Sequence, residues 1–260
     1  MIFYFYILFF LIFFSCSEFQ KALKSDDFDY KLKLAFDYYE KKDYFKAKSL
    51  LESLEATYKM TPFADKVLLY LGYCYLYEKD YYTASYYFKS VSSRYPLSQY
   101  REEADFMYAY TLYLDSPNYQ LDQSNTYKAL DALQEFINNY PNSDRINECN
   151  KMIDKLREKL ETKLFEAAKL YFDIEEFKAA KVSFKHLLNE YPDTKYREIA
   201  LYYIAKSSFL HAFNSIESKK NERLEEAINE YYKFKLEYPE SKFKNEIERY
   251  YNVAINYLKK

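Results

Sequence analysis

Apolar residues recur along this chain at the spacing of amphipathic helices, and the recurrence is itself repeated five times. In each copy an alanine is followed four residues later by an aromatic residue or a leucine, and eleven residues later by a tyrosine. The alanines are Ala47, Ala84, Ala129, Ala180 and Ala227, and the tyrosines are Tyr58, Tyr95, Tyr140, Tyr191 and Tyr238. Internal repetition of this kind is typical of a solenoid, in which each unit buries its apolar face by stacking on its neighbours.

The second copy is the clearest, and its spacing fits the tetratricopeptide pattern of two antiparallel helices. It reads Leu68-x-x-Leu71-Gly72-x-x-Tyr75, then Ala84-x-x-x-Phe88, then Pro96. We expect Gly72 and Ala84 where the helices cross most closely, with Phe88 filling the space beneath. Proline then ends the second helix, because it lacks an N–H and clashes with the preceding turn. Later copies carry the same signature at Ala129 and Pro141, at Ala180 and Pro192, and at Ala227 and Pro239.

The repeats predict an all-α tetratricopeptide-repeat superhelix of about five helix hairpins. Their spacing exceeds the usual period, and we expect the surplus residues between the helices of two hairpins, at Asp115–Ser124 and Asn214–Arg223. An N-cap at Ser143 and a continuous apolar stripe after it predict one helix of roughly 28 residues. We therefore divide the chain into repeats one to three (29–143) and a long helix with repeats four and five (144–260).

Composition excludes several classes of function. Lys and Arg number 38 against 40 Asp and Glu, interspersed along the chain, which argues against the basic stripe of a nucleic-acid-binding protein. A single glycine leaves little room for a phosphate-binding loop, and the sequence holds neither a nucleophile elbow nor a Cys/His pairing. We predict no enzyme activity, no metal and no cofactor, and we expect Cys74 and Cys149 to be isolated and buried.

Aromatic residues are abundant, with 34 Tyr and 22 Phe but no Trp. One reading is a stacking platform for sugars or bases. The preferred reading is mutational bias towards AT-rich codons, with most rings at helical spacing and therefore in the core.

The first residues, MIFYFYILFFLIFFS, are uncharged and strongly apolar. Their length suits the apolar region of a signal peptide better than a membrane-spanning helix, which needs about 20 residues. Ser15-Cys16 at its end resembles a bacterial lipobox, although position 13 is Phe where Leu is usual. We predict a signal peptide at 1–15, lipidation of Cys16 and a flexible tether over 16–28. An uncleaved membrane anchor is the alternative.

Five polar residues are the best candidates for binding a partner, because the repeat itself does not require them. Asp122, Gln123 and Thr126 begin the second helix of the third hairpin. Arg157 and Glu161 are four residues apart on the long helix, so they can pair with each other or with a partner. Local capping and ordinary surface pairing are the competing explanations.

With these motifs in view, the chain resembles the BamD family of tetratricopeptide lipoproteins over essentially its whole mature length. The most specific segment is Leu121-Asp122-Gln123-Ser124-Asn125-Thr126-Tyr127-Lys128-Ala129, followed by Tyr140-Pro141-Asn142-Ser143. Further similarity lies in Ile153-Asp154-Lys155-Leu156-Arg157-x-x-Leu160 and in Tyr191-Pro192-Asp193-Thr194.

The resemblance implies a periplasmic scaffold that is tethered by lipid to the outer membrane. Its implied partners are the insertase of the β-barrel assembly machinery, at the C-terminal repeats, and unfolded barrel substrates, at the N-terminal repeats. Many relatives carry Asn-Arg where this chain has Val182-Ser183, so a charged contact there cannot be transferred to it.

Two other classes of lipoprotein remain open. A nutrient- or glycan-binding lipoprotein also uses tetratricopeptide helices, but such proteins are about twice as long and read sugars with Trp. A repeat-based coordinator of the cell envelope usually adds a coiled coil, and no sustained heptad pattern occurs here.

Overall fold

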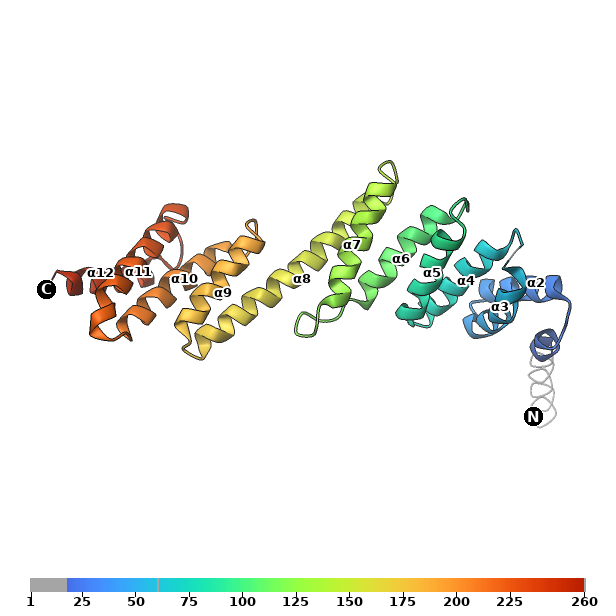
Figure 1. The fold of residues 1–260 in the computed structure, drawn as a ribbon, viewed down its shortest axis with the longest axis horizontal. Coiled ribbons are helices and arrows are strands. Elements are labelled where there is room, and N and C mark those ends of the chain that lie inside the picture. The colour runs from blue at the N-terminus through green and yellow to red at the C-terminus, as the bar shows by residue number, and fades with distance from the viewer. Residues whose placement is uncertain (1–17, 60, 260) are drawn as a thin grey trace, which may run out of the picture. The chain divides into compact units, whose positions relative to one another are not determined.

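The chain folds into successive antiparallel helix hairpins (Figure 1). The computed structural model describes residues 18–59 and 61–259, and these contain helices and turns but no strand. We call the first helix of each hairpin its A helix and the second its B helix. The A helices are α2 (Phe28–Glu40), α4 (Ala64–Tyr77), α6 (Arg101–Asp115), α8 (Ile146–Asp173) and α10 (Arg197–Phe213). The B helices are α3 (Tyr44–Tyr58), α5 (Tyr81–Arg94), α7 (Ser124–Asn139), α9 (Phe177–Glu190) and α11 (Glu217–Glu237), followed by a last helix, α12 (Lys244–Leu258). The predicted all-α fold of helix hairpins is confirmed.

The hairpins group into two units, each with its own core. Unit 1 comprises Met1–Pro117 and Asp122–Ile153, and unit 2 comprises Asn118–Leu121 and Asp154–Lys260. Helix α8 begins in unit 1 and continues in unit 2. The largest fully buried side chains of unit 1 are Leu50, Leu51, Leu54, Leu71, Phe88, Leu133 and Phe136. Those of unit 2 are Leu156, Phe184, Phe209, Tyr231 and Phe234.

Each hairpin is held together where a B-helix alanine meets its A helix. All five repeat alanines are 0% exposed. In the second hairpin Gly72 of the A helix meets Phe88 of the B helix, and a Cβ at Gly72 would lie only 2.7 Å from Cε1 of Phe88. The helices approach so closely that the Phe88 ring occupies the space of that methyl group. Apolar area buried here stabilises the hairpin by about 25 cal/mol per Å².

The repeated Tyr-Pro-x-Ser/Thr sequence forms the turn from one hairpin to the next. At its tyrosines the backbone leaves the helix, while each N–H still donates to the carbonyl four residues earlier, as from Tyr95 to Val91. The hydroxyl oxygen of the Ser or Thr then accepts the N–H of the residue two positions later, which initiates the next A helix. These bonds run from Tyr100 to Ser98, Arg145 to Ser143, Tyr196 to Thr194 and Phe243 to Ser241, at 3.0–3.3 Å.

Turns inside three hairpins are so short that one residue takes a left-handed conformation. These residues are Lys42, Lys79 and Glu175, with φ between 61° and 65°. Glycine would adopt this conformation without strain, whereas in other residues it costs about 1 kcal/mol of conformational free energy. Aspartates cap the helices that follow two of these turns, with Asp43 and Asp80 accepting N–H groups of the first turn.

The long helix and the first insertion are as predicted, but Ser143 is not the N-cap, because α8 begins at Ile146 and Ser143 lies in the turn before it. Helix α8 has 28 residues, and no helix covers the segment between Asp115 and Ser124. The prediction that Asn214–Arg223 lies between two helices was wrong, because α11 already begins at Glu217. Residues 217–223 are helical since they are good helix formers and carry i,i+3 ion pairs, such as Lys219–Glu222. Most of the extra residues of this repeat therefore lengthen α11.

Residues 18–23 differ from the flexible tether that we expected over 16–28. They are helical, and Phe19 and Ala22 are buried. The Phe19 ring meets that of Tyr38 edge-on, with centroids 6.0 Å apart. Two apolar side chains three residues apart give this short segment a face to bury.

We predict that Gly72→Ala destabilises the chain by about 1–3 kcal/mol, because the new methyl group overlaps the Phe88 ring. Urea unfolding measures this loss. In a Phe88→Leu background the smaller side chain leaves room, so the added cost of Gly72→Ala should shrink. Strictly additive losses in the double variant would contradict close packing at this crossing.

Candidate protein-interaction surface

The described residues offer no site for metal or thiol chemistry. They contain no group of His, Cys, Asp and Glu placed to hold a metal ion. Cys74 and Cys149 are unpaired and buried, as expected, and burial raises their thiol pKa values to about 12 and about 11. Such thiols stay protonated and unreactive at neutral pH. The predicted lipidation site, Cys16, lies outside the described residues.

The most distinctive surface of unit 1 is a cluster of aromatic rings on α2, α4 and the first residue of α3. We call it the tyrosine surface, formed by Phe36, Tyr39, Tyr44, Tyr70, Tyr73 and Tyr77. The spacing of Tyr70, Tyr73 and Tyr77 puts their side chains on one face of α4. Tyr39 of α2 packs against Tyr70 with ring centroids 4.7 Å apart, and Tyr44 stacks on Tyr77 at 4.4 Å.

The tyrosine surface is apolar in its rings and polar at its edge. Tyr77 is 50% exposed, and the other rings are half-buried. Burial raises the pKa values of Tyr39 and Tyr73 far above the usual range, so their hydroxyls remain neutral hydrogen-bonding groups. The Lys66 ammonium lies 4.4 Å from the Phe36 ring centroid, which adds a cation–π contact. Because the Tyr73 hydroxyl already donates to Glu103, the surface offers mainly its flat rings to a ligand, with Tyr77 the most exposed.

Helix α6 continues this aromatic character within unit 1. Phe106 and Tyr110 lie parallel with centroids 6.2 Å apart, and Tyr113 stacks beyond Tyr110 at 6.4 Å. The guanidinium of Arg145 lies 4.2 Å from the centre of the Phe106 ring. Phe106 itself is buried, so on α6 only the half-buried Tyr110 and Tyr113 extend the aromatic character towards the surface.

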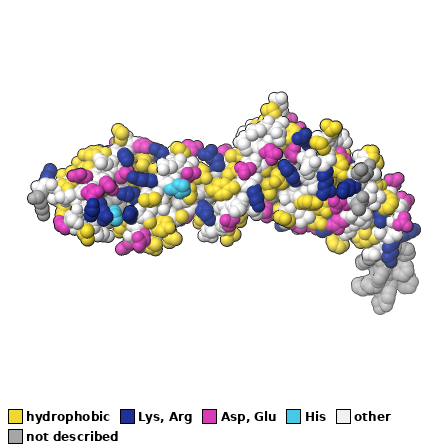
Figure 2. Space-filling model, viewed as in Figure 1, with side chains coloured by type: hydrophobic (Ala, Val, Ile, Leu, Met, Phe, Trp, Pro, Cys, Tyr) yellow, Lys and Arg dark blue, Asp and Glu magenta, His cyan; other side chains and the backbone are white. Residues whose placement is uncertain are grey.

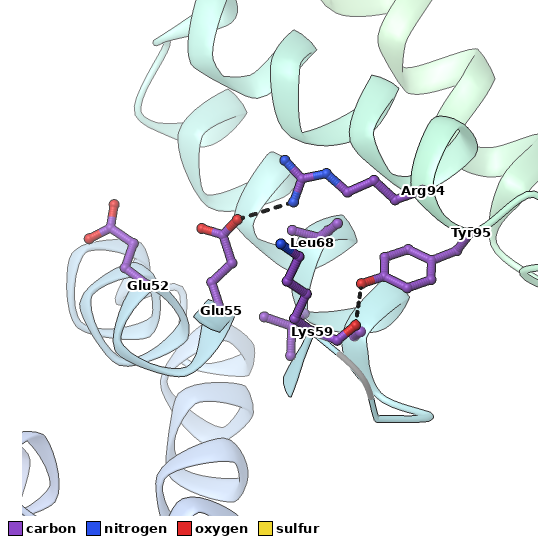
Figure 3. Close-up of a pocket in the computed structure, with 8 residues that line it drawn as sticks. Glu52, Glu55, Lys59, Leu68, Arg94 and Tyr95 are labelled. Atoms are coloured by element: carbon purple, nitrogen blue, oxygen red, sulfur yellow. Dashed lines mark hydrogen bonds and ion pairs between the residues drawn. The ribbon is translucent and has the colours of Figure 1, made fainter. Parts of the chain in front are cut away.

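A separate hollow of about 390 Å³ lies among α3, α4 and α5 (Figure 3). Several of its polar groups already have partners: Arg94 lies 3.5 Å from the Glu55 carboxylate, and Tyr95 donates its hydroxyl to the Lys59 carbonyl at 2.8 Å. Glu52 accepts the Tyr75 hydroxyl. These contacts join neighbouring helices, and they supply no acid–base pair aimed at a substrate.

Two of the predicted binding residues lie inside the third hairpin. Thr126 is 0% exposed, and its hydroxyl donates to Gln123 Oε1 at 2.7 Å and contacts Ser116 Oγ at 2.6 Å. Gln123 is 4% exposed. Asp122 is exposed and accepts the Ser124 N–H at 2.9 Å. Together they secure the start of α7, and a partner-binding role for them stays a prediction.

Arg157 and Glu161 do not pair with each other but meet the same turn. Arg157 contacts Asp193 at 3.2 Å, and Glu161, 9% exposed, accepts the Thr194 hydroxyl at 2.7 Å. The Glu161 bond has counterparts in other hairpins, from Ser98 to Asp65 and from Ser241 to Glu198. An A-helix carboxylate thus recurrently holds the turn after its own hairpin, so this placement is structural.

Charges of both signs mingle on the face of each unit that Figure 2 shows. Many belong to ion pairs between neighbouring helices, such as Arg197–Glu237 and Lys206–Glu246. No helix of the described residues is long and apolar enough to cross a membrane.

Comparison with known families gives a match over most of the chain. A family model described as "YfiO: Outer membrane lipoprotein" matches residues 31–209, which is more than half of the chain. A search of curated proteins found no match.

Solved structures with similar helices are tetratricopeptide proteins. The TPR domain of P58(IPK) is 14% identical, and the match covers 91% of this chain and 67% of that one with a TM-score of 0.43. A TPR repeats protein from Bacteroides fragilis is 16% identical, with coverage of 89% and 99% and a TM-score of 0.44. Because both TM-scores are below 0.5, we assign the fold from the observed helix hairpins and not from these matches.

We predict that Thr194→Val destabilises unit 2 by about 2 kcal/mol, because it leaves the buried Glu161 carboxylate without its donor. Urea unfolding would measure the loss. Thr57→Val, at an exposed threonine, is the matched control and should change stability by less than about 0.5 kcal/mol. Equal stability of the two variants would mean that Glu161 does not hold the turn.

Proposed function

Because the chain belongs to the YfiO family of outer membrane lipoproteins, we propose that it is a BamD-like scaffold of the β-barrel assembly machinery. In this proposal it binds the barrel insertase and unfolded barrel substrates on the periplasmic side of the outer membrane. Repeat solenoids suit such work, since they offer long surfaces without a closed active site.

The N-terminal sequence supports a lipid anchor. We propose that the signal peptide is removed before Cys16 and that the cysteine receives acyl chains. Two or more chains hold a protein stably on a membrane without a spanning helix. This anchor places the helical hairpins next to the membrane into which barrels are inserted.

The tyrosine surface is the observation that carries the proposed contact with substrates. Barrel strands alternate apolar and polar side chains, and girdles of aromatic residues flank their apolar band. Before insertion their apolar faces and strand edges are exposed and prone to aggregate. Half-buried rings can stack on such side chains, while tyrosine hydroxyls bond to unpaired backbone groups. The contact is broad and shallow, which suits temporary holding and release.

The proposed contact with the insertase belongs to the C-terminal repeats. Val182 is 58% exposed on α9, beside Ser183. We propose that an apolar contact replaces, at this position, the charged contact that relatives can make. The insertase surface opposite would then be apolar as well.

We predict that Tyr39→Ala and Tyr77→Ala each weaken binding of a synthetic barrel-strand peptide about 5- to 30-fold, as truncating a central aromatic residue does at other interfaces. Fluorescence anisotropy of the labelled peptide with the intact protein would measure affinity. Tyr82→Ala is the matched control: Tyr82 is 81% exposed on α5, outside the tyrosine surface, and its loss should leave affinity unchanged.

An equal loss in all three variants would count against the tyrosine surface as the contact. Micromolar binding of glycans, with no binding of the peptide, would instead favour the nutrient-binding class of lipoprotein.

A further inference from the structure

Helices α9 and α11 of unit 2 are joined by a regular row of ion pairs. Lys181 lies 3.2 Å from Glu226, and Lys185 lies 2.6 Å from Glu230. Both pairs join residues that are 45 positions apart. Successive lysines of α9 therefore face successive glutamates of α11 in one register.

Continued to the next position, the same register would set two positive charges opposite each other. Lys178 lies one turn before Lys181, and the residue 45 positions after it is Arg223. Lys178 is also the second residue of α9, where the positive end of the helix dipole disfavours a cation. Its ammonium has no ion-pair partner among the described residues. At this position a second cation therefore takes the place of the glutamate.

His211, at the end of α10, lies within the field of these cations. Burial and the charges of Arg223, Lys181 and Lys178 lower its pKa, and only Glu226 opposes them. Glu226 is already paired with Lys181. Arg223 Nη1 donates to Ser215 Oγ at 2.6 Å, which holds the guanidinium near the turn that precedes α11. Three cations of α9 and α11 therefore act on His211, against one carboxylate, Glu226.

We propose that Lys178, Arg223 and His211 form a docking site for an acidic segment of a partner protein. A carboxylate between Lys178 and Arg223 would supply the negative charge that each neighbouring position obtains from a glutamate. The guanidinium can bind that carboxylate through two parallel hydrogen bonds. Neutral His211 can donate one more.

The surroundings of this site favour a protein over a lipid surface. Apolar side chains are exposed in the preceding turns and on α9: Ile174 is 57% exposed, Ile216 71% and Val182 58%. The two turns lie along the lower edge of unit 2 in Figure 1. Membrane binding through charge needs clusters of several unpaired basic residues, whereas Glu226 and Glu230 alternate with the lysines here. A small charged centre beside apolar side chains is typical of a specific protein interface.

This inference goes beyond the proposed function, because it specifies the chemistry of the partner segment and not the identity of the partner. An acidic segment of the insertase would satisfy it, and so would one from another envelope protein. The two proposals can therefore fail separately.

The first test separates docking from a structural role. Lys178→Glu places a carboxylate opposite Arg223 and removes the repulsion, so the melting temperature of the isolated protein should rise by about 1–3 °C. Lys155→Glu, at an exposed lysine without a described partner in unit 2, is the control and should not raise it. A fall in melting temperature with Lys178→Glu would mean that Lys178 and Arg223 do not repel each other, and it would overturn the inference.

The second test uses the full lipoprotein in its own cell envelope. A photo-cross-linking residue replaces Ile216, and mass spectrometry maps the peptide joined to it. We expect a protein segment with Asp or Glu within a few residues of the link. Lys178→Glu/Arg223→Glu should lower the yield about tenfold, and Lys155→Glu should not.

Reversing the charge of the mapped acidic residue should then restore the yield in the doubly substituted chain. Cross-links to lipid alone, a partner peptide without a carboxylate, or a yield that is insensitive to the double charge reversal would each overturn the inference. Partner segments from proteins other than the insertase would support it while counting against the proposed contact with the insertase.

Discussion

The close crossing of the two helices within each hairpin is the constraint on which the remaining structure depends. Five fully buried alanines, and Gly72 against the Phe88 ring, let the helices approach closely. Within each unit, a short hydrophobic face on every helix then suffices to bury a shared core as hairpins stack. Outside this packing, apolar and aromatic side chains stay exposed on both kinds of helix, such as Tyr77 on α4 and Val182 on α9.

The turns between hairpins show how structural and functional residues can be mistaken for each other. The sequence makes Arg157 and Glu161 candidates for partner binding, because the repeat pattern does not require them. Glu161 nevertheless makes a bond that Asp65 and Glu198 make in other hairpins. The sequence held the signal, since Asp65 and Glu161 each precede the next Tyr-Pro proline by 31 residues. Comparing acidic residues across repeats would have revealed their shared role.

Most of the fold was predictable, because small residues, prolines and apolar periodicity act locally. The second insertion was misjudged since its charged residues suit a loop and a solvated helix equally, and only the i,i+3 pairs of α11 decide between them. The tyrosine surface was not predictable. With 34 tyrosines in the chain, spacing alone cannot separate rings that face the core from rings that face outward. Left-handed Lys42 and Lys79 were equally hidden, because glycine is the usual signal for that conformation.

The most direct test of the scaffold role is mild cross-linking in intact cells, purification through a C-terminal tag, and mass spectrometry of the recovered proteins. The account predicts recovery of the barrel insertase, with its cross-links at residues after Asn142. Recovery of a nutrient transporter or of cell-wall enzymes in its place would contradict the assembly role and leave the repeat fold intact.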